Sequence, residues 1–207
     1  MLGALALVSV SVVDGSYPPG LASKLLHFAE ASYCPDQRVA GWECPPCKLE
    51  PAFNVTRVLS RHADDTHGFV GYDSNENAVI AAFRGTDPLR VRSWMVDLES
   101  AVQVQYPYAD CKGCQVAEGF YSAFAAIRNE AVSAVTKLVA QYPSARIMIT
   151  GHSLGAAYAT LLAMALLREG SRSMTVITFG LPVCTAGSIF RPYGCHQPQQ
   201  LLLTESS

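Results

Sequence analysis

One serine lies in a setting that could make it a nucleophile. Gly151 to Gly155 fit the pattern G-x-S-x-G around Ser153, with an apolar run over residues 146–150 before it and a helical pattern over residues 154–168 after it. Strand, tight turn and helix in this order form a nucleophile elbow, which lifts the serine hydroxyl out of the sheet. The turn leaves no room for side chains beside the serine, so glycine flanks it. The alternative is an ordinary serine N-cap between two glycines.

A serine nucleophile needs a histidine base and a carboxylate that orients the base. With this elbow, the acid and then the histidine follow the serine in the chain. After Ser153 the carboxylates are Glu169 and Glu205, and the histidine is His196. Glu169 ends the next helix, Glu205 follows His196 in the wrong order, and His196 lies in a Pro- and Gln-rich stretch typical of a solvated tail. His152 is expected to pack under the turn. We therefore expect the triad acid and base to be absent.

The elbow also offers donors for the negative charge of a tetrahedral intermediate. The helix after Ser153 begins with free backbone N–H groups, which suit an oxyanion. Thr86 follows the strand-like residues 78–83 and is expected where the sheet edge meets the elbow. The alternative is a threonine in an ordinary turn.

The segments around the elbow predict an α/β fold, with a mostly parallel sheet flanked by helices. Apolar residues at helical spacing predict helices over 21–33 and 120–140. Residues 69–72 and 78–83 are typical of a hairpin-like strand pair, and residues 174–179 of a further strand. Apolar strands that alternate with helices are typical of a buried parallel sheet.

Composition limits the classes of function. The chain has 207 residues, 50% hydrophobic and 15% charged, which favours one domain with a substantial core and excludes global disorder. A formal net charge of -2 gives no basic field for nucleic acid and no polybasic patch for anionic lipid. The apolar run from Ala156 to Leu167 is too short for a membrane span.

The N-terminus and one short motif indicate secretion. Residues 1–13 are uncharged and mostly apolar, which favours a signal peptide over residues 1–15, although no Lys or Arg precedes the apolar part. The alternatives are a buried N-terminal strand and a gene model that starts a few codons late. Asn54-Val55-Thr56 is an N-glycosylation sequon, which is consistent with a secreted, extracellular protein.

Structural disulfides best explain the cysteines. A zinc site would bring the two C-x-x-C pairs together in a small module, but a long strand-like stretch separates them. A redox C-x-x-C needs a thioredoxin-like strand and helix, which neither pair has. The odd count leaves one thiol over and hints at an incomplete chain. The cysteines are Cys34, Cys44, Cys47, Cys111, Cys114, Cys184 and Cys195.

Five motifs resemble the fungal-type, or class 3, lipase family over roughly residues 25–182. The resemblance implies an α/β-hydrolase fold and hydrolysis of carboxylic esters of lipids, typically triacylglycerols, at a lipid–water interface and without a metal or organic cofactor. The motifs are Phe83-Arg84-Gly85-Thr86 (F-R-G-[ST]), Ser93-Trp94 with Asp97-Leu98 (N-W-x-x-D-L), Val116 to Phe120 (V-H-x-G-F, with Ala117 in place of the histidine), Gly151 to Ala157 (G-H-S-L-G-[GA]-A) and Thr178 to Pro182 (T-F-G-x-P).

The resemblance also implies roles for single residues. Ser153 is the nucleophile, and residues 87–93 hold a lid over the site. The oxyanion donors are the hydroxyl and N–H of Thr86 and the N–H of Leu154. The residues that shape the elbow are Gly151, His152 and Gly155.

The family pattern stops at Pro182. The family continues with R-V-G-[ND] and two strands that bear the aspartate and the histidine, whereas residues 183–207 lack periodicity and are expected to form a loose tail. We therefore expect an α/β-hydrolase truncated at its C-terminal strands by a shifted frame, a retained intron or alternative splicing, with little activity of its own. The alternatives are a non-catalytic lipid-binding module and another serine hydrolase, such as a peptidase or acyltransferase.

Overall fold

A seven-stranded sheet forms the centre of the molecule. The computed structural model describes residues 8–12, 19–61, 65–86, 102–106, 115–171, 173–180 and 199–205. The strands are β1 (Val8–Val12), β2 (Phe53–Arg61), β3 (Thr66–Asp73), β4 (Ala78–Phe83), β5 (Gln103–Gln105), β6 (Gln115–Ala117), β7 (Arg146–His152), β8 (Ser173–Phe179) and β9 (Gln199–Glu205). The helices are α1 (Pro19–Ala31), α2 (Asp36–Ala40), the 3₁₀ turn η1 (Pro46–Leu49), α4 (Glu118–Gln141) and α5 (Leu154–Arg168).

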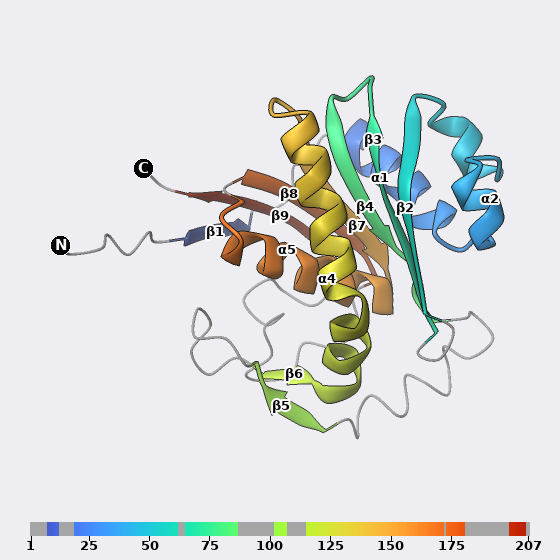
Figure 1. The fold of residues 1–207 in the computed structure, drawn as a ribbon. Helices are drawn as coiled ribbons and strands as arrows, with labels where there is room; N and C mark the ends of the chain where they lie inside the picture. Colours follow the sequence, from blue (N-terminus) through green and yellow to red (C-terminus); the bar gives the residue numbers. More distant parts are fainter. Residues whose placement is uncertain are drawn as a thin grey trace.

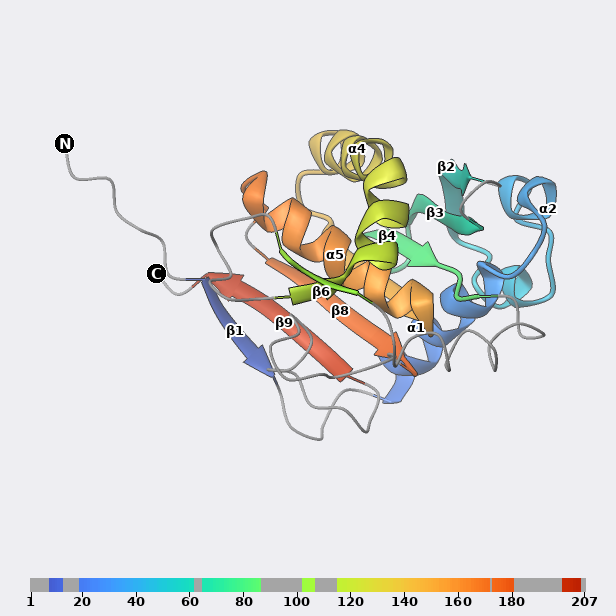
Figure 2. The ribbon, with the colours of Figure 1, turned by 90° about the horizontal axis from the view of Figure 1, so that it is seen from below.

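The sheet is mixed, and its parallel centre carries the elbow. The strand order is β1-β9-β8-β7-β4-β3-β2, with β7 parallel to both β4 and β8. The other pairings in this sheet are antiparallel. Helices α4 and α5 cover one face and α1 the other (Figures 1 and 2). This is the expected layered α/β arrangement.

Two apolar clusters, one on each face, hold the layers together. On the α4/α5 face, α4 and α5 pack against β4, β7 and β8, and the side chains of α5 are mostly buried. On the opposite face, α1 packs Leu25 and Phe28 against Phe53, Phe69 and the sheet. Every residue of β4 is buried, which explains its continuous apolar sequence. Within the described residues, no helix combines the length and apolarity that crossing a membrane requires.

Most predicted elements are present. The predicted helices correspond to α1, α4 and α5, and the hairpin to β3 and β4. Strand β2 was not predicted. It lies at the sheet edge, and its pairing with β3 shifts register between Val55 and Arg57, which breaks the alternation of apolar and polar residues.

The prediction of a loose tail is wrong for residues 199–205. They form β9, which pairs with β8 from Thr178↔Gln199 to Ser173↔Thr204. The physical reason is that the apolar Leu201 to Leu203 can extend along β8, which would otherwise expose a row of unpaired backbone groups. Strand β1 pairs with β9 in turn. Residues 8–12 of the predicted signal peptide therefore form a strand here, and a strand was the alternative left open by the sequence.

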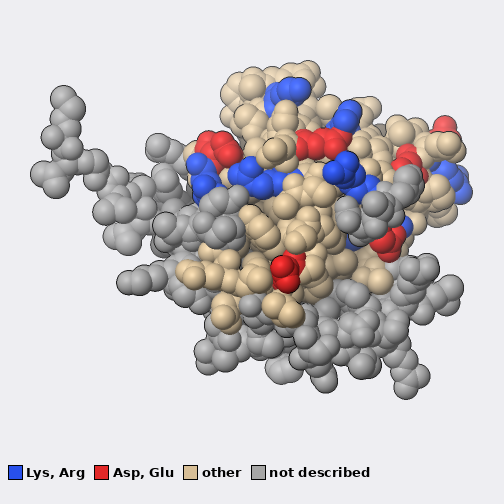
Figure 3. Space-filling view, turned by 60° about the horizontal axis from the view of Figure 1, so that its bottom comes forward, with Lys and Arg blue, Asp and Glu red and all other residues tan. Residues whose placement is uncertain are grey.

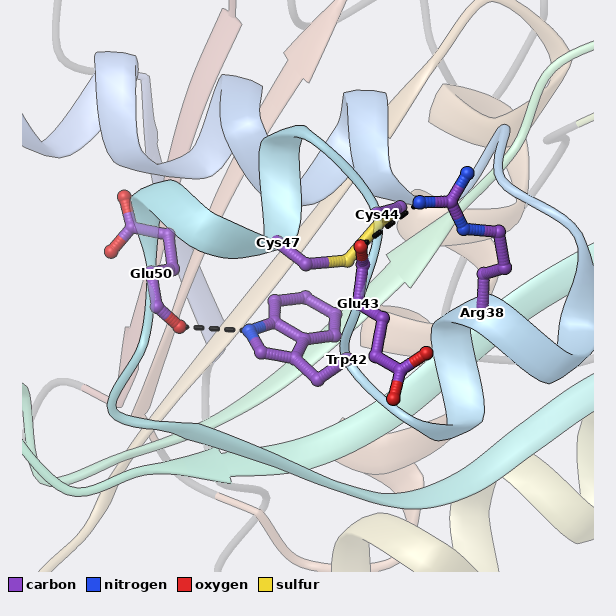
Figure 4. The surroundings of a disulfide bond; sticks show 6 residues. All are labelled: Arg38, Trp42, Glu43, Cys44, Cys47 and Glu50. Carbon is purple, nitrogen blue, oxygen red and sulfur yellow. Dashed lines mark hydrogen bonds between the residues drawn. A yellow bond between two sulfur atoms is a disulfide. The ribbon is translucent and has the colours of Figure 1, made fainter.

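The Cys- and Pro-rich segment after α1 contains a disulfide, as expected. Cys44 and Cys47 are bonded to each other and fully buried. Figure 4 shows the Trp42 indole beside this disulfide, with its N–H donating to the Glu50 carbonyl oxygen at 2.8 Å. Cys34 is a free thiol whose pKa is raised by burial. Cys111, Cys114, Cys184 and Cys195 fall outside the described ranges.

Candidate active site

Ser153 occupies the sharp turn between β7 and α5. Its backbone has φ 55° and ψ -125°, a left-handed region that non-glycine residues rarely adopt and that costs about 1–3 kcal/mol. Two backbone bonds hold this conformation: the Ser153 N–H donates to the Phe179 carbonyl at 2.9 Å, and the Ala156 N–H donates to the Ser153 carbonyl at 2.9 Å. The predicted strand, tight turn and helix are therefore present, and the end of β8 supports the turn.

Steric contacts explain why glycine flanks the serine. A Cβ on Gly151 would lie 2.2 Å from the Gly155 carbonyl oxygen, and a Cβ on Gly155 would lie 2.2 Å from the Phe83 carbonyl oxygen. Both contacts are with backbone, which cannot rotate away. The first turn of α5 can approach β7 and the end of β4 only because both side chains are absent.

Thr86 lies just beyond the end of β4, beside the elbow. A Cβ on the preceding Gly85 would lie 2.8 Å from the Ser153 Cβ, so this segment touches the serine. Thr86 is 9% exposed, and within the described part of the chain its buried hydroxyl has no hydrogen-bond partner. An unpaired buried hydroxyl costs about 1–3 kcal/mol. Such a group is well suited to donate to a ligand oxygen placed between Thr86 and Ser153.

His152 was expected to pack under the turn, but it lies at the surface, where it forms a hydrogen bond with a tyrosine hydroxyl. The imidazole remains exposed to solvent on one side, and its Nδ1 lies 2.7 Å from the Tyr33 hydroxyl oxygen. The Gly85 N–H donates to the same oxygen at 3.2 Å. Burial lowers the pKa of His152 and raises the pKa of Tyr33, so both are neutral near pH 7. The tyrosine oxygen accepts from the Gly85 N–H, and the direction of its hydrogen bond with Nδ1 depends on the imidazole tautomer.

Tyr33 thus joins three segments, the turn after α1, the end of β4 and the elbow, and sequence reasoning missed it. It lies 119 positions from His152 and 52 from Gly85, and no local pattern marks it. The bond occupies the Nδ1 of His152, and no imidazole among the described residues bonds to the Ser153 hydroxyl.

Glu169 and the backbone of Glu205 both lie away from Ser153. Glu169 caps the far end of α5, whose 15 residues span about 22 Å, and it pairs with Arg128 at 3.3 Å. Glu205 ends β9 beside the beginning of β8, so it lies at the opposite end of the strands from the elbow. His196 and the expected lid, residues 87–93, lie outside the described residues. In the described part of the chain, no cluster of His, Cys, Asp and Glu could hold a metal ion.

Ala117, which stands where the lipase pattern has histidine, lies at the junction of β6 and α4. It is 7% exposed and belongs to the apolar cluster on the α4/α5 face. Its small side chain is thus part of the core.

The fold and the elbow define an α/β-hydrolase: helices flank the sheet, and a serine at positive φ follows a central parallel strand. The family model "Lipase (class 3)" matches residues 80–197. The chain belongs to this family. The match continues past Pro182, where the sequence motifs end.

Relatives and solved structures agree with this membership. The chain is 33% identical over 147 residues to a lipase of Rhizomucor miehei, covering 69% of this chain and 39% of that protein. It is 36% identical over 118 residues to the secreted mono- and diacylglycerol lipase A of Penicillium cyclopium, covering 57% and 37%. The native propeptide complex of the R. miehei lipase superposes with a TM-score of 0.70 at 29% identity, covering 82% of this chain and 54% of that chain. The chain therefore spans well under half of these two curated relatives.

Proposed function

We propose that this chain bears the nucleophile and the oxyanion hole of a secreted hydrolase that acts on carboxylic esters of lipids. The observation that carries the proposal is the buried, unpaired Thr86 hydroxyl beside a serine held at φ 55° in an elbow. The family membership, and relatives named as lipases, support lipid esters as the substrate class.

In the proposed reaction, the Ser153 oxygen attacks the ester carbonyl carbon and pushes an electron pair onto the carbonyl oxygen. The Thr86 hydroxyl and N–H and the Leu154 N–H donate to this oxyanion, which stabilises the transition state more than the substrate. Collapse of the intermediate expels the alcohol and leaves an acyl-serine, which water hydrolyses. The proton of Ser153 must pass to a base and from the base to the leaving alcohol, and no imidazole among the described residues forms a hydrogen bond with the serine hydroxyl.

Secretion is supported by three observations. Residues 1–13 are uncharged and mostly apolar, Cys44 and Cys47 form a disulfide, and the relative from P. cyclopium is named as secreted. Disulfides persist in oxidising compartments. A mature protein that begins after residue 15 would lack β1, so N-terminal sequencing of secreted material tests this part directly.

Because no imidazole among the described residues bonds to the Ser153 hydroxyl, we expect this chain to hydrolyse p-nitrophenyl butyrate less than about tenfold faster than its Ser153→Ala variant. A positioned base contributes about 10²–10⁴-fold to such a reaction. The measurement is the initial rate at pH 7.5 with matched concentrations of folded protein. A rate hundreds of times above that of Ser153→Ala would show that this chain supplies its own base.

Thr86→Val should separate stability from activity. Valine has the shape of threonine without the hydroxyl, so removing an unpaired buried donor should leave stability unchanged or raise it by about 1 kcal/mol. Loss of one oxyanion donor costs about 10²–10³-fold in rate. The activity assay contains imidazole as an external base. In this assay, the difference in rate between a protein with Ser153 and its Ser153→Ala variant should vanish when Thr86 is replaced by valine. Urea unfolding measures the change in stability. Retention of that rate by Thr86→Val would contradict an oxyanion role for the hydroxyl.

A non-catalytic lipid-binding module is a second candidate. It is favoured by β9 and β1, which extend the sheet beyond β8 so that β8 is paired on both sides. It predicts equal binding of triacylglycerol emulsions by the chain and by Ser153→Ala, with no Ser153-dependent hydrolysis even when an external base is added.

A further inference from the structure

Asn54 lies in the edge strand of the sheet and is open to solvent. It is the second residue of β2, the last strand in the order, and both Asn54 and Thr56 are exposed. Asn54-Val55-Thr56 is the only Asn-x-Ser/Thr sequence in the chain. The proposed catalytic function makes no use of this segment.

The side chain of Asn54 projects to the α4/α5 face of the sheet. Its neighbours Phe53 and Val55 both pack into the apolar cluster on the opposite, α1 face. Successive side chains of a strand point to opposite faces, so Asn54 points away from that cluster. The register shift between Val55 and Arg57 comes after Asn54 and does not change its direction.

A pair of tyrosines lies directly across from Asn54. In the antiparallel pairing of β2 with β3, Asn54 is opposite Tyr72. Tyr72 belongs to the periphery of the cluster on the α4/α5 face, and its ring stacks on that of Tyr142, with centroids 3.7 Å apart and planes at 2°. Both rings are partly exposed. Opposite residues of an antiparallel pair have Cβ atoms about 4.5–5.5 Å apart, which is within the length of one sugar ring.

We propose that Asn54 carries an N-linked glycan whose first sugar packs against Tyr72. The Asn54 side-chain nitrogen forms a bond to C1 of an N-acetylglucosamine and loses a proton. The bond between C1 and the phosphate of a lipid-linked oligosaccharide diphosphate breaks, and the lipid diphosphate leaves with its electron pair. The C–H face of the sugar then covers the partly exposed apolar surface of the Tyr72 ring. The bulky glycan also blocks pairing of the exposed β2 edge with other chains. This inference rests on the proposed secretion.

The site is tested by expressing the full chain in yeast behind the host's own leader peptide. The leader sends the chain into the secretory route whether or not residues 1–15 can do so. Expression with the native N-terminus and no added leader tests the secretion proposal separately. We expect one glycan, removed by peptide N-glycosidase, present in Thr56→Ser and absent in Thr56→Ala and Asn54→Gln. Leader removal without any glycan on Asn54 would overturn the proposal.

The contact with Tyr72 is tested by melting temperature. Trimming with endoglycosidase H leaves a single sugar on Asn54, which should keep Tm about 3 °C above that of the fully deglycosylated chain. Tyr72→Phe keeps the ring and should keep this difference, whereas Tyr72→Leu should abolish it. Comparing glycosylated and deglycosylated forms of the same variant cancels any effect of the substitution on folding. An equal difference in Tyr72→Leu would show that the sugar does not pack on the ring.

Discussion

Gly155→Ala is expected to lower the free energy of unfolding by about 3 kcal/mol or more. The new Cβ would lie 2.2 Å from the carbonyl oxygen and 2.6 Å from the carbonyl carbon of Phe83. Phe83 ends β4, which pairs with β3 on one side and β7 on the other, so its backbone cannot yield. Relief would have to come from moving α5 off the sheet. Overpacking typically costs about 1–3 kcal/mol, and a clash with fixed backbone lies at or above the upper end.

Gly119→Ala is the matched control for this steric argument. Gly119 lies in the first turn of α4, belongs to another family motif, and would place its Cβ within 4 Å of nothing. Alanine there should raise stability by about 0.5–1 kcal/mol, because glycine is the poorer helix former. Both variants are measured by urea unfolding. If Gly155→Ala proved as stable as Gly119→Ala, the close approach of α5 to β4 would be wrong.

Lys24→Met is expected to lower the free energy of unfolding by about 3 kcal/mol, because it removes the cation beside the buried Asp73, whereas Glu50 keeps His27 and Glu76 keeps Arg146. The ammonium of Lys24, on α1, lies 3.2 Å from Glu50, 3.0 Å from Glu76 and 3.8 Å from Asp73. Asp73 is 0% and Glu50 6% exposed. Burial alone would lower the pKa of Lys24, but the hydrogen bond to Glu76 and the charge of Asp73 outweigh it and raise the pKa.

Arg57→Met is the control for Lys24→Met, because it removes a cation from an exposed ion pair. Arg57 pairs with Glu130, but their side chains are 58% and 35% exposed, so the pair should contribute only about 0–1 kcal/mol. The Lys24 variant should lose part of its deficit at low pH, because the hydrogen bond to Lys24 lowers the pKa of Glu76, so the stability that this pair gives the unsubstituted chain falls as Glu76 is protonated. Equal effects of the two substitutions at pH 7 would show that the Lys24 cluster is not stabilising.

The parts of the site that local geometry dictates could be predicted from the sequence. Gly151 and Gly155 are fixed by contacts within a few residues or with the adjacent strand, so the pattern around Ser153 carries the geometry of the elbow. The helices and the hairpin are also encoded locally, in the spacing of their apolar residues. Thr86 was placed by its position after a buried strand and by family resemblance.

The parts that depend on distant partners could not be predicted. Tyr33 forms hydrogen bonds with Gly85 and His152, which lie 52 and 119 positions further along the chain. A tyrosine just after a helix carries no signal of such bonds. The strand over residues 199–205 follows a stretch without periodicity, and what makes it a strand is the open edge of β8. In both cases tertiary contacts decide, and a single sequence does not display them.

The most direct test of Ser153 as the nucleophile is the rate of p-nitrophenyl butyrate hydrolysis as a function of imidazole concentration, for the chain and for Ser153→Ala. Imidazole can accept the serine proton in place of a positioned histidine, and the variant reports the reaction of imidazole with the ester alone. We predict that the rate of the chain rises with imidazole to about ten times that of Ser153→Ala. Identical rates for the two proteins at every imidazole concentration would contradict the assignment of Ser153 as the nucleophile.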